Sequence, residues 1–171
     1  MTCILGIDPG SRVTGFGVIN KDDHSCSYIS SGCIRATREA FNERLRIIHQ
    51  GIQKIVDRYQ PDVVCIEKVF MAKNADSALK LGQARGAAIV AAQDVKVVEY
   101  TPTQIKYTVT GIGRADKDLV RSMVMKYLNL NDKPQIDASD ALAIAICHVK
   151  SNQILKRINV SPSNRRRYIR L

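Results

Sequence analysis

A chain of 171 residues with 45% hydrophobic and 25% charged residues can bury a full core in one domain, and its composition is that of an ordinary globular protein. Its charge is unusual: 26 Lys and Arg residues against 16 Asp and Glu residues give a net charge of +10 and a pI near 9.6, which favours a phosphate-rich partner. No apolar stretch approaches the roughly 20 residues needed to span a bilayer, so we expect no membrane-spanning segment.

The five cysteines are odd in number and include no Cys-x-x-Cys pair. We therefore expect reduced thiols in a cytoplasmic protein, and neither a disulfide framework nor a zinc site. The first residues also lack the basic region and long apolar run of a signal peptide. Because anionic membranes attract basic proteins too, charge alone does not choose between a membrane surface and a nucleic acid.

In chain order, the hydrophobic pattern predicts three strands, a helix, a strand, a helix, a strand and three further helices. The predicted ranges are 3–8, 13–19, 25–34, 39–59, 62–67, 77–93, 96–100, 103–109, 116–128 and 138–151. Short turns between the first three strands indicate an antiparallel meander. The first strand is apolar on both faces, which places it centrally in the sheet. The predicted fold class is α/β, a five-stranded mixed sheet flanked by helices.

Small residues predict two close approaches between backbones. Gly15 and Gly17 indicate that another segment packs directly on one face of the second strand. In the second predicted helix, Ala78, Gly82 and Gly86 recur every four residues. That stripe is typical either of tight packing on the sheet or of a helix–helix contact in a dimer, and the pattern alone leaves both open.

The chain ends in a basic segment. We expect residues 1–152 to form one folded domain and residues 153–171 a flexible tail, because the tail carries Lys and Arg but no acidic residue. Such a tail makes at most a nonspecific contact with phosphate, and a merely solvated end is the simpler alternative.

Four acidic residues lie where apolar segments begin or end. Asp8 ends the first predicted strand, Glu67 ends the fourth, and Asp137 and Asp140 open the last helix. A carboxylate at the mouth of a buried element loses hydration unless a cation neutralises it. Asp137 and Asp140 are three residues apart, so a helix projects both to the same side. These four carboxylates could therefore converge at one edge of the sheet.

Oxygen ligands without a His or Cys partner favour Mg²⁺ or Mn²⁺ over zinc. Two such ions about 3.5–4 Å apart can hold the attacking and leaving oxygens of a phosphodiester. Each acid also has a simpler interpretation: Asp8 as a turn residue, Asp137 as the N-cap of the last helix, and Asp140 as a first-turn acid favoured by the helix dipole. The metal hypothesis therefore rests on the set of four.

Two further segments fit a nucleic-acid substrate. Just after Glu67, Phe70 and Met71 stand between Lys68 and Lys73. Apolar side chains of this kind can wedge between the bases of an opened duplex or stack on them, although burial of Phe70 in the core is the simpler alternative.

The second segment, Gly111-Ile112-Gly113-Arg114, leads into a predicted helix that starts near Lys117. Exposed amides together with Lys117 could hold a phosphate there, with Arg114 as a further DNA contact. Glycine-rich turns before helices are common, so this pattern is less specific.

Long ordered strings resemble the RuvC family of bacterial Holliday junction resolvases, over about Leu5 to His148. The matching strings are Leu5-Gly6-Ile7-Asp8-Pro9-Gly10-Ser11-Arg12, Ile66-Glu67-Lys68-Val69-Phe70-Met71-Ala72-Lys73-Asn74-Ala75-Asp76-Ser77 and Asp137-Ala138-Ser139-Asp140-Ala141-Leu142-Ala143-Ile144-Ala145. The resemblance implies an RNase H-like fold, which agrees with the predicted order of elements.

The resemblance also implies roles for single residues. It makes metal ligands of the four carboxylates Asp8, Glu67, Asp137 and Asp140, active-site lysines of Lys106 and Lys117, and a junction-opening aromatic of Phe70. It implies two Mg²⁺ ions per site, with Mn²⁺ able to substitute. The implied enzyme is a homodimer that nicks two strands of a four-way DNA junction symmetrically, leaving 5′-phosphate and 3′-hydroxyl ends, and that works with the RuvA–RuvB branch-migration complex.

Three alternatives differ in what they require. A sugar-kinase or actin-like ATPase also reads Asp-x-Gly-Ser after its first strand, but it needs a second related domain for which 171 residues leave little room. Another RNase H-like nuclease would cut RNA–DNA hybrids in place of junctions. A noncatalytic junction-binding protein has no need of the intact carboxylate set.

Overall fold

The computed structural model describes residues 1–22, 25–37, 39–69 and 74–157. The elements follow the predicted order: β1 (Thr2–Asp8), β2 (Val13–Lys21), β3 (Cys26–Arg35), α1 (Phe41–Tyr59), β4 (Val63–Glu67), α2 (Ala75–Ala91), β5 (Val97–Tyr100), α3 (Pro102–Thr110), α4 (Lys117–Leu128) and α5 (Ile136–Arg157). The predicted end of the last helix at 151 is wrong, because α5 continues through Arg157. The boundary expected after residue 152 therefore falls inside a helix.

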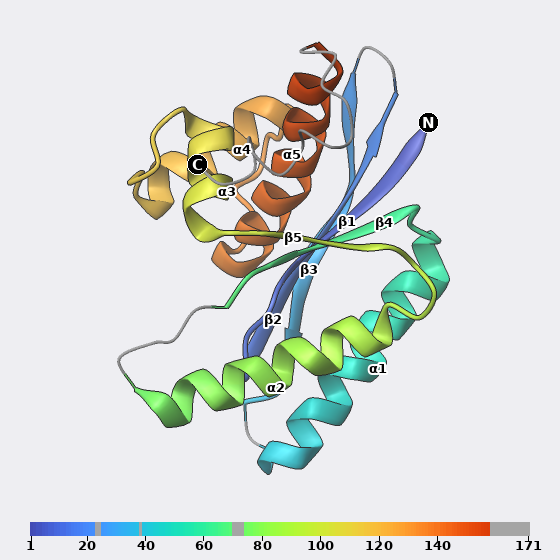
Figure 1. Cartoon of the computed structure of the whole chain (residues 1–171). Helices are drawn as coiled ribbons and strands as arrows, with labels where there is room; N and C mark the ends of the chain where they lie inside the picture. The colour runs from blue at the N-terminus through green and yellow to red at the C-terminus, as the bar shows by residue number, and fades with distance from the viewer. Residues whose placement is uncertain (23–24, 38, 70–73, 158–171) are drawn as a thin grey trace.

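The five strands form one mixed sheet in the order β3-β2-β1-β4-β5 (Figure 1). β1 runs antiparallel to β2 and parallel to β4, and β2 and β3 complete the antiparallel meander. Both predictions about the sheet, its mixed character and the central place of β1, are confirmed. The parallel register pairs Ile7 with Ile66, so the residues that follow them, Asp8 and Glu67, end neighbouring strands at the same edge.

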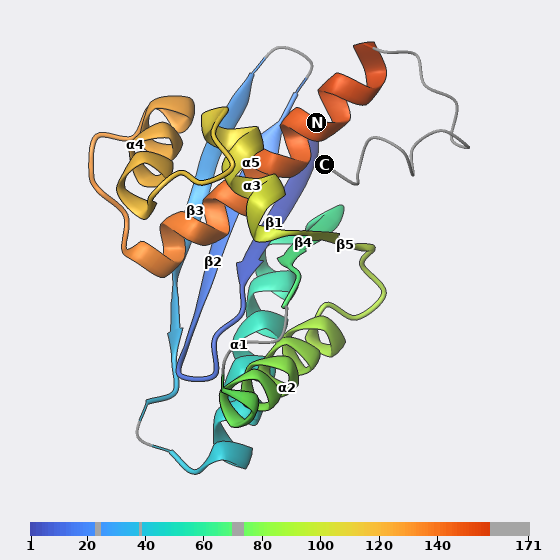
Figure 2. The same cartoon turned by 60° about the vertical axis from the view of Figure 1, so that its left-hand side comes forward.

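Helices cover both faces of the sheet. α1 and α2 lie on one face, and α5 lies on the other with α3 and α4 beside it, as Figures 1 and 2 show from two directions. Residues of β1 alternate between the two cores: Ile4 packs with α5, whereas Leu5 and Ile7 pack with α1 and α2. By the same alternation, Asp8 belongs to the α5 face.

Glycines let the backbone of α5 lie directly on the sheet. A Cβ atom added to Gly15 would stand 2.0 Å from the carbonyl oxygen of Asp137, and one added to Gly6 would stand 2.1 Å from that of Ala141. At Gly17 the backbone nitrogen of Leu142 would be 2.8 Å away. The close approach predicted from Gly15 and Gly17 is therefore confirmed, and the approaching segment is the first half of α5.

The small residues of α2 divide between two sides of the helix. Ala84 and Ala88 are buried against the sheet and α1, whereas a Cβ atom on Gly82 or Gly86 would meet nothing within 4 Å. Packing of these two glycines on the sheet, the first of the two alternatives, is therefore wrong.

In the described residues, no helix has both the length and the apolar character needed to cross a membrane.

Candidate active site

Strand geometry brings the first two carboxylates together. Side chains alternate along a strand, so Asp8 faces the same side of the sheet as Gly6, and Glu67 the same side as Cys65. Both positions face α5. Asp8 and Glu67 therefore stand beside each other at the ends of two parallel strands, on the face that α5 covers.

The start of α5 adds the other two carboxylates. Asp8 pairs in register with Gly15, and Gly15 touches the backbone of Asp137. Asp140 lies one helical turn further on and lines a pocket together with Asp8 and Glu67. The N-cap interpretation of Asp137 is wrong, because α5 begins at Ile136 and Asp137 lies inside the first turn. Asp140 is beyond that turn, so the dipole interpretation of Asp140 is wrong as well.

The pocket has a volume of about 170 Å³ and combines two kinds of charge on an apolar floor. Its charged lining is Asp8, Glu67, Asp140, Lys106 and Lys117, and its apolar lining includes Ile105, Val120 and Ala143. These residues come from β1, β4, α3, α4 and α5. The pocket therefore depends on long-range assembly of the whole domain.

Crowded carboxylates disfavour charge in this pocket. Burial, followed by the negative charges of Asp140, Glu67 and Asp137, raises the pKa of Asp8 to about 8. Burial and the charge of Asp140 also raise the pKa of Glu67. Lys117 acts in the opposite direction on both groups. An additional cation would relieve the remaining repulsion.

The two lysines reach the pocket from neighbouring helices, Lys106 from the middle of α3 and Lys117 from the start of α4. Thr101 and Gln104 form a capping box, with hydrogen bonds of 2.9 and 3.1 Å, that starts α3 immediately after β5 and places Lys106 in the pocket wall. Lys117 is the first residue of α4, and its Nζ atom donates to Oδ2 of Asp140 at 3.0 Å. That hydrogen bond is the main reason why the pKa of Lys117 is raised.

Arg85 supports Glu67 from behind, a role that sequence reasoning missed. Its Nε atom donates to the backbone carbonyl of Glu67 at 3.1 Å, and its guanidinium pairs with Glu99 on β5. Lys68 stands 4.0 Å from the same Glu99 side chain. The sequence carries no local signal for the contact between Arg85 and Glu67, because the two residues are 18 positions apart.

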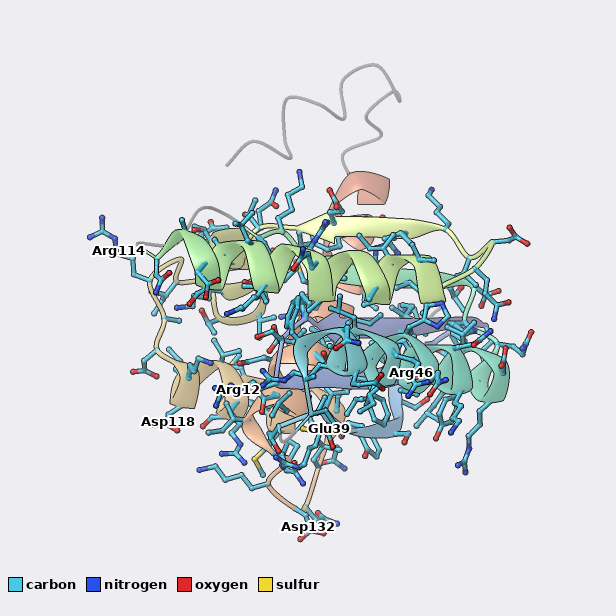
Figure 3. All side chains as sticks on the ribbon, turned by 90° about the horizontal axis from the view of Figure 1, so that it is seen from below. Arg12, Glu39, Arg46, Arg114, Asp118 and Asp132 are labelled. Atoms are coloured by element: carbon cyan, nitrogen blue, oxygen red, sulfur yellow. The ribbon has the colours of Figure 1, made fainter. Side chains whose placement is uncertain are left out.

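The remaining predicted site residues do not gather at the pocket. Arg114 is exposed and projects from the edge of the molecule (Figure 3). The amide of Leu119 in the first turn of α4 already donates to Asp116 at 2.8 Å, and Lys117 is paired with Asp140, so the phosphate site expected there is not supported. Phe70 and Lys73 lie outside the described residues.

The donor set fits a divalent cation that is shared with a substrate phosphate. Within the described part of the chain, no three His, Cys, Asp or Glu side chains are arranged to hold a metal ion by themselves. Mg²⁺ in phosphate-processing sites is usually held by one or two carboxylates, water and substrate phosphate oxygens. Carboxylates on one pocket, with the pKa of Asp8 raised to about 8 by burial and by the neighbouring negative charges, match that requirement.

A family model described as crossover junction endodeoxyribonuclease RuvC matches residues 4–148. The chain belongs to the RuvC family. A crossover junction endodeoxyribonuclease RuvC from Pseudomonas fluorescens is 57% identical over 157 residues, which make up 91% of this chain and 90% of that protein. RuvC family nucleases use divalent metal ions, in agreement with the acidic pocket.

Solved structures of RuvC proteins share the fold. The structure described as T. thermophilus RuvC in complex with Holliday junction substrate has a TM-score of 0.83 at 32% identity, covering 90% of this chain and 96% of that one. The yeast mitochondrial Holliday junction resolvase has a TM-score of 0.64 at 13% identity, covering 90% and 82%, and shows likeness of fold alone. The RNase H-like fold expected from the sequence is confirmed.

Proposed function

We propose that this protein is a structure-selective endonuclease that resolves four-way DNA junctions by paired, symmetric nicks. The observation that carries the proposal is the convergence of Asp8, Glu67 and Asp140 on one pocket in a RuvC family chain. The T. thermophilus relative described with a Holliday junction substrate supports the choice of junction DNA.

In this proposal, the four carboxylates Asp8, Glu67, Asp137 and Asp140 hold two Mg²⁺ ions, which Mn²⁺ can replace. When bound, such cations make water a better nucleophile and stabilise the leaving 3′ oxygen. Asp8 must first release the proton that its raised pKa favours. Lys106 and Lys117 place positive charge where the phosphodiester gains negative charge as the P–O3′ bond breaks. The products are 5′-phosphate and 3′-hydroxyl ends.

DNA contacts outside the pocket are also part of the proposal. Phe70 is proposed to open the junction by stacking, with Lys73 and Arg114 binding phosphates. The exposure of Arg114 supports its role, whereas the roles of Phe70 and Lys73 rest on the sequence alone.

A homodimer is proposed because paired nicks on a two-fold junction need two sites. The outer side of α2 supports this assignment: Leu79 is 68% exposed, Val90 is 69% exposed, and Gly82 and Gly86 face open space.

Cooperation with a RuvA–RuvB complex rests on family membership alone. A cytoplasmic location is supported by five free cysteine thiols.

Cleavage assays with three substrates test this function. A synthetic four-way junction, the matching duplex and an RNA–DNA hybrid of the same sequence are incubated with the protein, with and without Mg²⁺. We expect Mg²⁺-dependent cleavage of the junction, in two symmetric strands, and little cleavage of the others. Preferred cleavage of the hybrid would instead identify a ribonuclease, and tight junction binding without cleavage would identify a noncatalytic binding protein.

A further inference from the structure

A second pocket, of about 310 Å³, lies beside the turn between β1 and β2. We call it the turn pocket. Ser11 and Arg12 reach it from that turn, Phe41 and Arg44 from the first turns of α1, and Asp76, Ser77 and Lys80 from the first turns of α2. Figure 2 shows the β1–β2 turn and the first turns of both helices together at the lower end of the molecule. The turn pocket shares no residue with the acidic pocket.

Positive charge is in excess in the turn pocket. Arg12, Arg44 and Lys80 supply three cations, and Asp76 supplies one carboxylate, which accepts a hydrogen bond from Lys80 at 2.6 Å. Within the described residues the guanidinium of Arg12 forms no ion pair, and the Nε atom of Arg44 donates a hydrogen bond to the backbone carbonyl of Glu39 at 2.8 Å. Gathering uncompensated cations opposes folding, so their convergence indicates an anionic ligand.

The polar groups of the turn pocket suit a phosphate. Two guanidinium groups can each offer a planar pair of donors to phosphate oxygens, and the hydroxyl groups of Ser11 and Ser77 are additional donors. The α1 N-cap, Ala40, makes no side-chain hydrogen bond to the first turn of α1. The carboxylate of Asp76 is the one repulsive group, and Lys80 neutralises it.

Chain connectivity ties the turn pocket to the acidic pocket. Ser11 follows Asp8 by three residues, a stretch of chain that spans at most about 10 Å. Successive phosphates of one DNA strand advance about 3.4 Å along the duplex axis. A phosphate within about three nucleotides of the cut is therefore close enough to reach the turn pocket.

We propose that the turn pocket binds a backbone phosphate of the DNA substrate, within about three nucleotides of the phosphate that is cut. Arg12 and Arg44 hold that phosphate, and Lys80 and the two serines complete the site. The proposal rests on the proposed nuclease function, because the DNA strand in the acidic pocket sets the position of this phosphate. The pocket sets the register of the strand without touching the reacting atoms.

The first test measures how junction binding depends on salt in the variants Arg12→Ala and Arg44→Ala. The control variant is Arg46→Ala, which removes one positive charge from α1 outside the turn pocket. In Figure 3, Arg12, from the β1–β2 turn, lies beside the first turn of α1, and Arg46 lies farther along that helix, where it pairs with Glu43. Junction affinity is measured in Ca²⁺ over a range of salt concentrations. We expect each pocket variant to bind about tenfold more weakly and to lower the salt slope by about one, and Arg46→Ala to resemble wild type.

Replacing single DNA phosphates with neutral analogues shows which phosphate contacts the turn pocket. Single methylphosphonates, which lack the negative charge, are placed at each phosphate near the cut. At one position within three nucleotides of the cut, methylphosphonate should weaken wild-type binding but not the binding of Arg12→Ala or Arg44→Ala. Equal effects in all proteins at every position would overturn the proposal, as would pocket variants that match Arg46→Ala.

Further outcomes distinguish an error in the turn-pocket proposal from an error in the proposed nuclease function. If inorganic phosphate protects Arg44 from guanidinium-modifying reagents while the pocket variants bind the junction normally, the pocket is a free-anion site and the proposal is wrong. Wild-type protein that neither binds nor cuts junctions contradicts the nuclease function itself. Wild-type protein that cuts junctions, with pocket variants that behave as Arg46→Ala does, contradicts the turn-pocket proposal alone.

Discussion

Asp8 is held in surroundings that disfavour its charge. Its half-buried side chain faces three other carboxylates, and Lys117, the cation that lowers its pKa, is already hydrogen-bonded to Asp140. Burial and these charges raise the pKa of Asp8 to about 8 from an ordinary value of 3.8. Fold stability alone does not favour several carboxylates at the end of one strand. The arrangement is consistent with the cation binding that we propose.

The raised pKa predicts how stability depends on pH. The folded protein holds the Asp8 proton more tightly than the unfolded chain, so stability from this group is present below pH 4 and is lost as the pH rises through about 8. Because Asn cannot ionise, the stability of an Asp8→Asn variant does not fall in this way as the pH rises. We expect Asp8→Asn to stabilise the metal-free protein by roughly 2 kcal/mol at pH 8.5 and by little at pH 4.5. Urea unfolding in EDTA at the two pH values measures the difference.

Asp132→Asn is the matched control, because Asp132 lies in an exposed loop away from the pocket (Figure 3). It should change stability by less than about 0.5 kcal/mol at both pH values. Adding Mg²⁺ should stabilise wild type more than Asp8→Asn. Equal stability of Asp8→Asn and wild type at pH 8.5 would show that Asp8 is not under electrostatic strain.

At the scale of elements, the pocket depends on how closely α5 lies on the sheet. Gly15 is paired in register with Asp8 and touches the Asp137 carbonyl, so it joins the strand that carries Asp8 to the helix that carries the other carboxylates. No larger residue fits there without moving α5. Small residues in β1 and β2 therefore serve the geometry of the acidic pocket as well as core packing.

Gly15→Ala tests this dependence. The new Cβ atom would stand 2.0 Å from backbone, which cannot rotate away, so we expect a loss of about 1–3 kcal/mol and a larger fractional loss of cleavage rate than of junction affinity. Gly32→Ala is the control on β3, where the nearest atom belongs to the ring of Phe16 at 2.9 Å. Denaturant unfolding and single-turnover cleavage of the two variants decide the question. Similar stability and rates for both would mean that α5 tolerates a shift at Gly15.

The order of elements and their approximate bounds could be predicted because each is a local pattern. The apolar runs that end in Asp8 and Glu67 also predicted where two carboxylates would meet, since parallel strands end at one edge of a sheet. The pairing of Lys117 with Asp140 and the support of Glu67 by Arg85 could not be predicted. These contacts join residues far apart in sequence, and no local periodicity encodes them.

At the scale of the whole molecule, the outer side of α2 predicts the dimer contact. Because a two-fold axis brings the same surface of both copies together, a bulky residue at Gly82 would meet its own copy or the opposing helix. We expect Gly82→Leu to shift the protein from dimer to monomer in sedimentation velocity. Gln50→Leu, an exposed change on α1, should leave the dimer intact. A Gly82→Leu variant that remains a tight dimer would place the interface on another surface.

The central claim is that four converging carboxylates cut junction DNA with the help of divalent metal. Single-turnover cleavage of a synthetic four-way junction by Asp8→Asn tests it most directly, with junction affinity measured alongside. We predict a loss of Mg²⁺-dependent cleavage of at least about 10³-fold, with binding largely retained, because Asn keeps the shape of Asp8 but not its charge. Cleavage by Asp8→Asn at the wild-type rate would contradict the account.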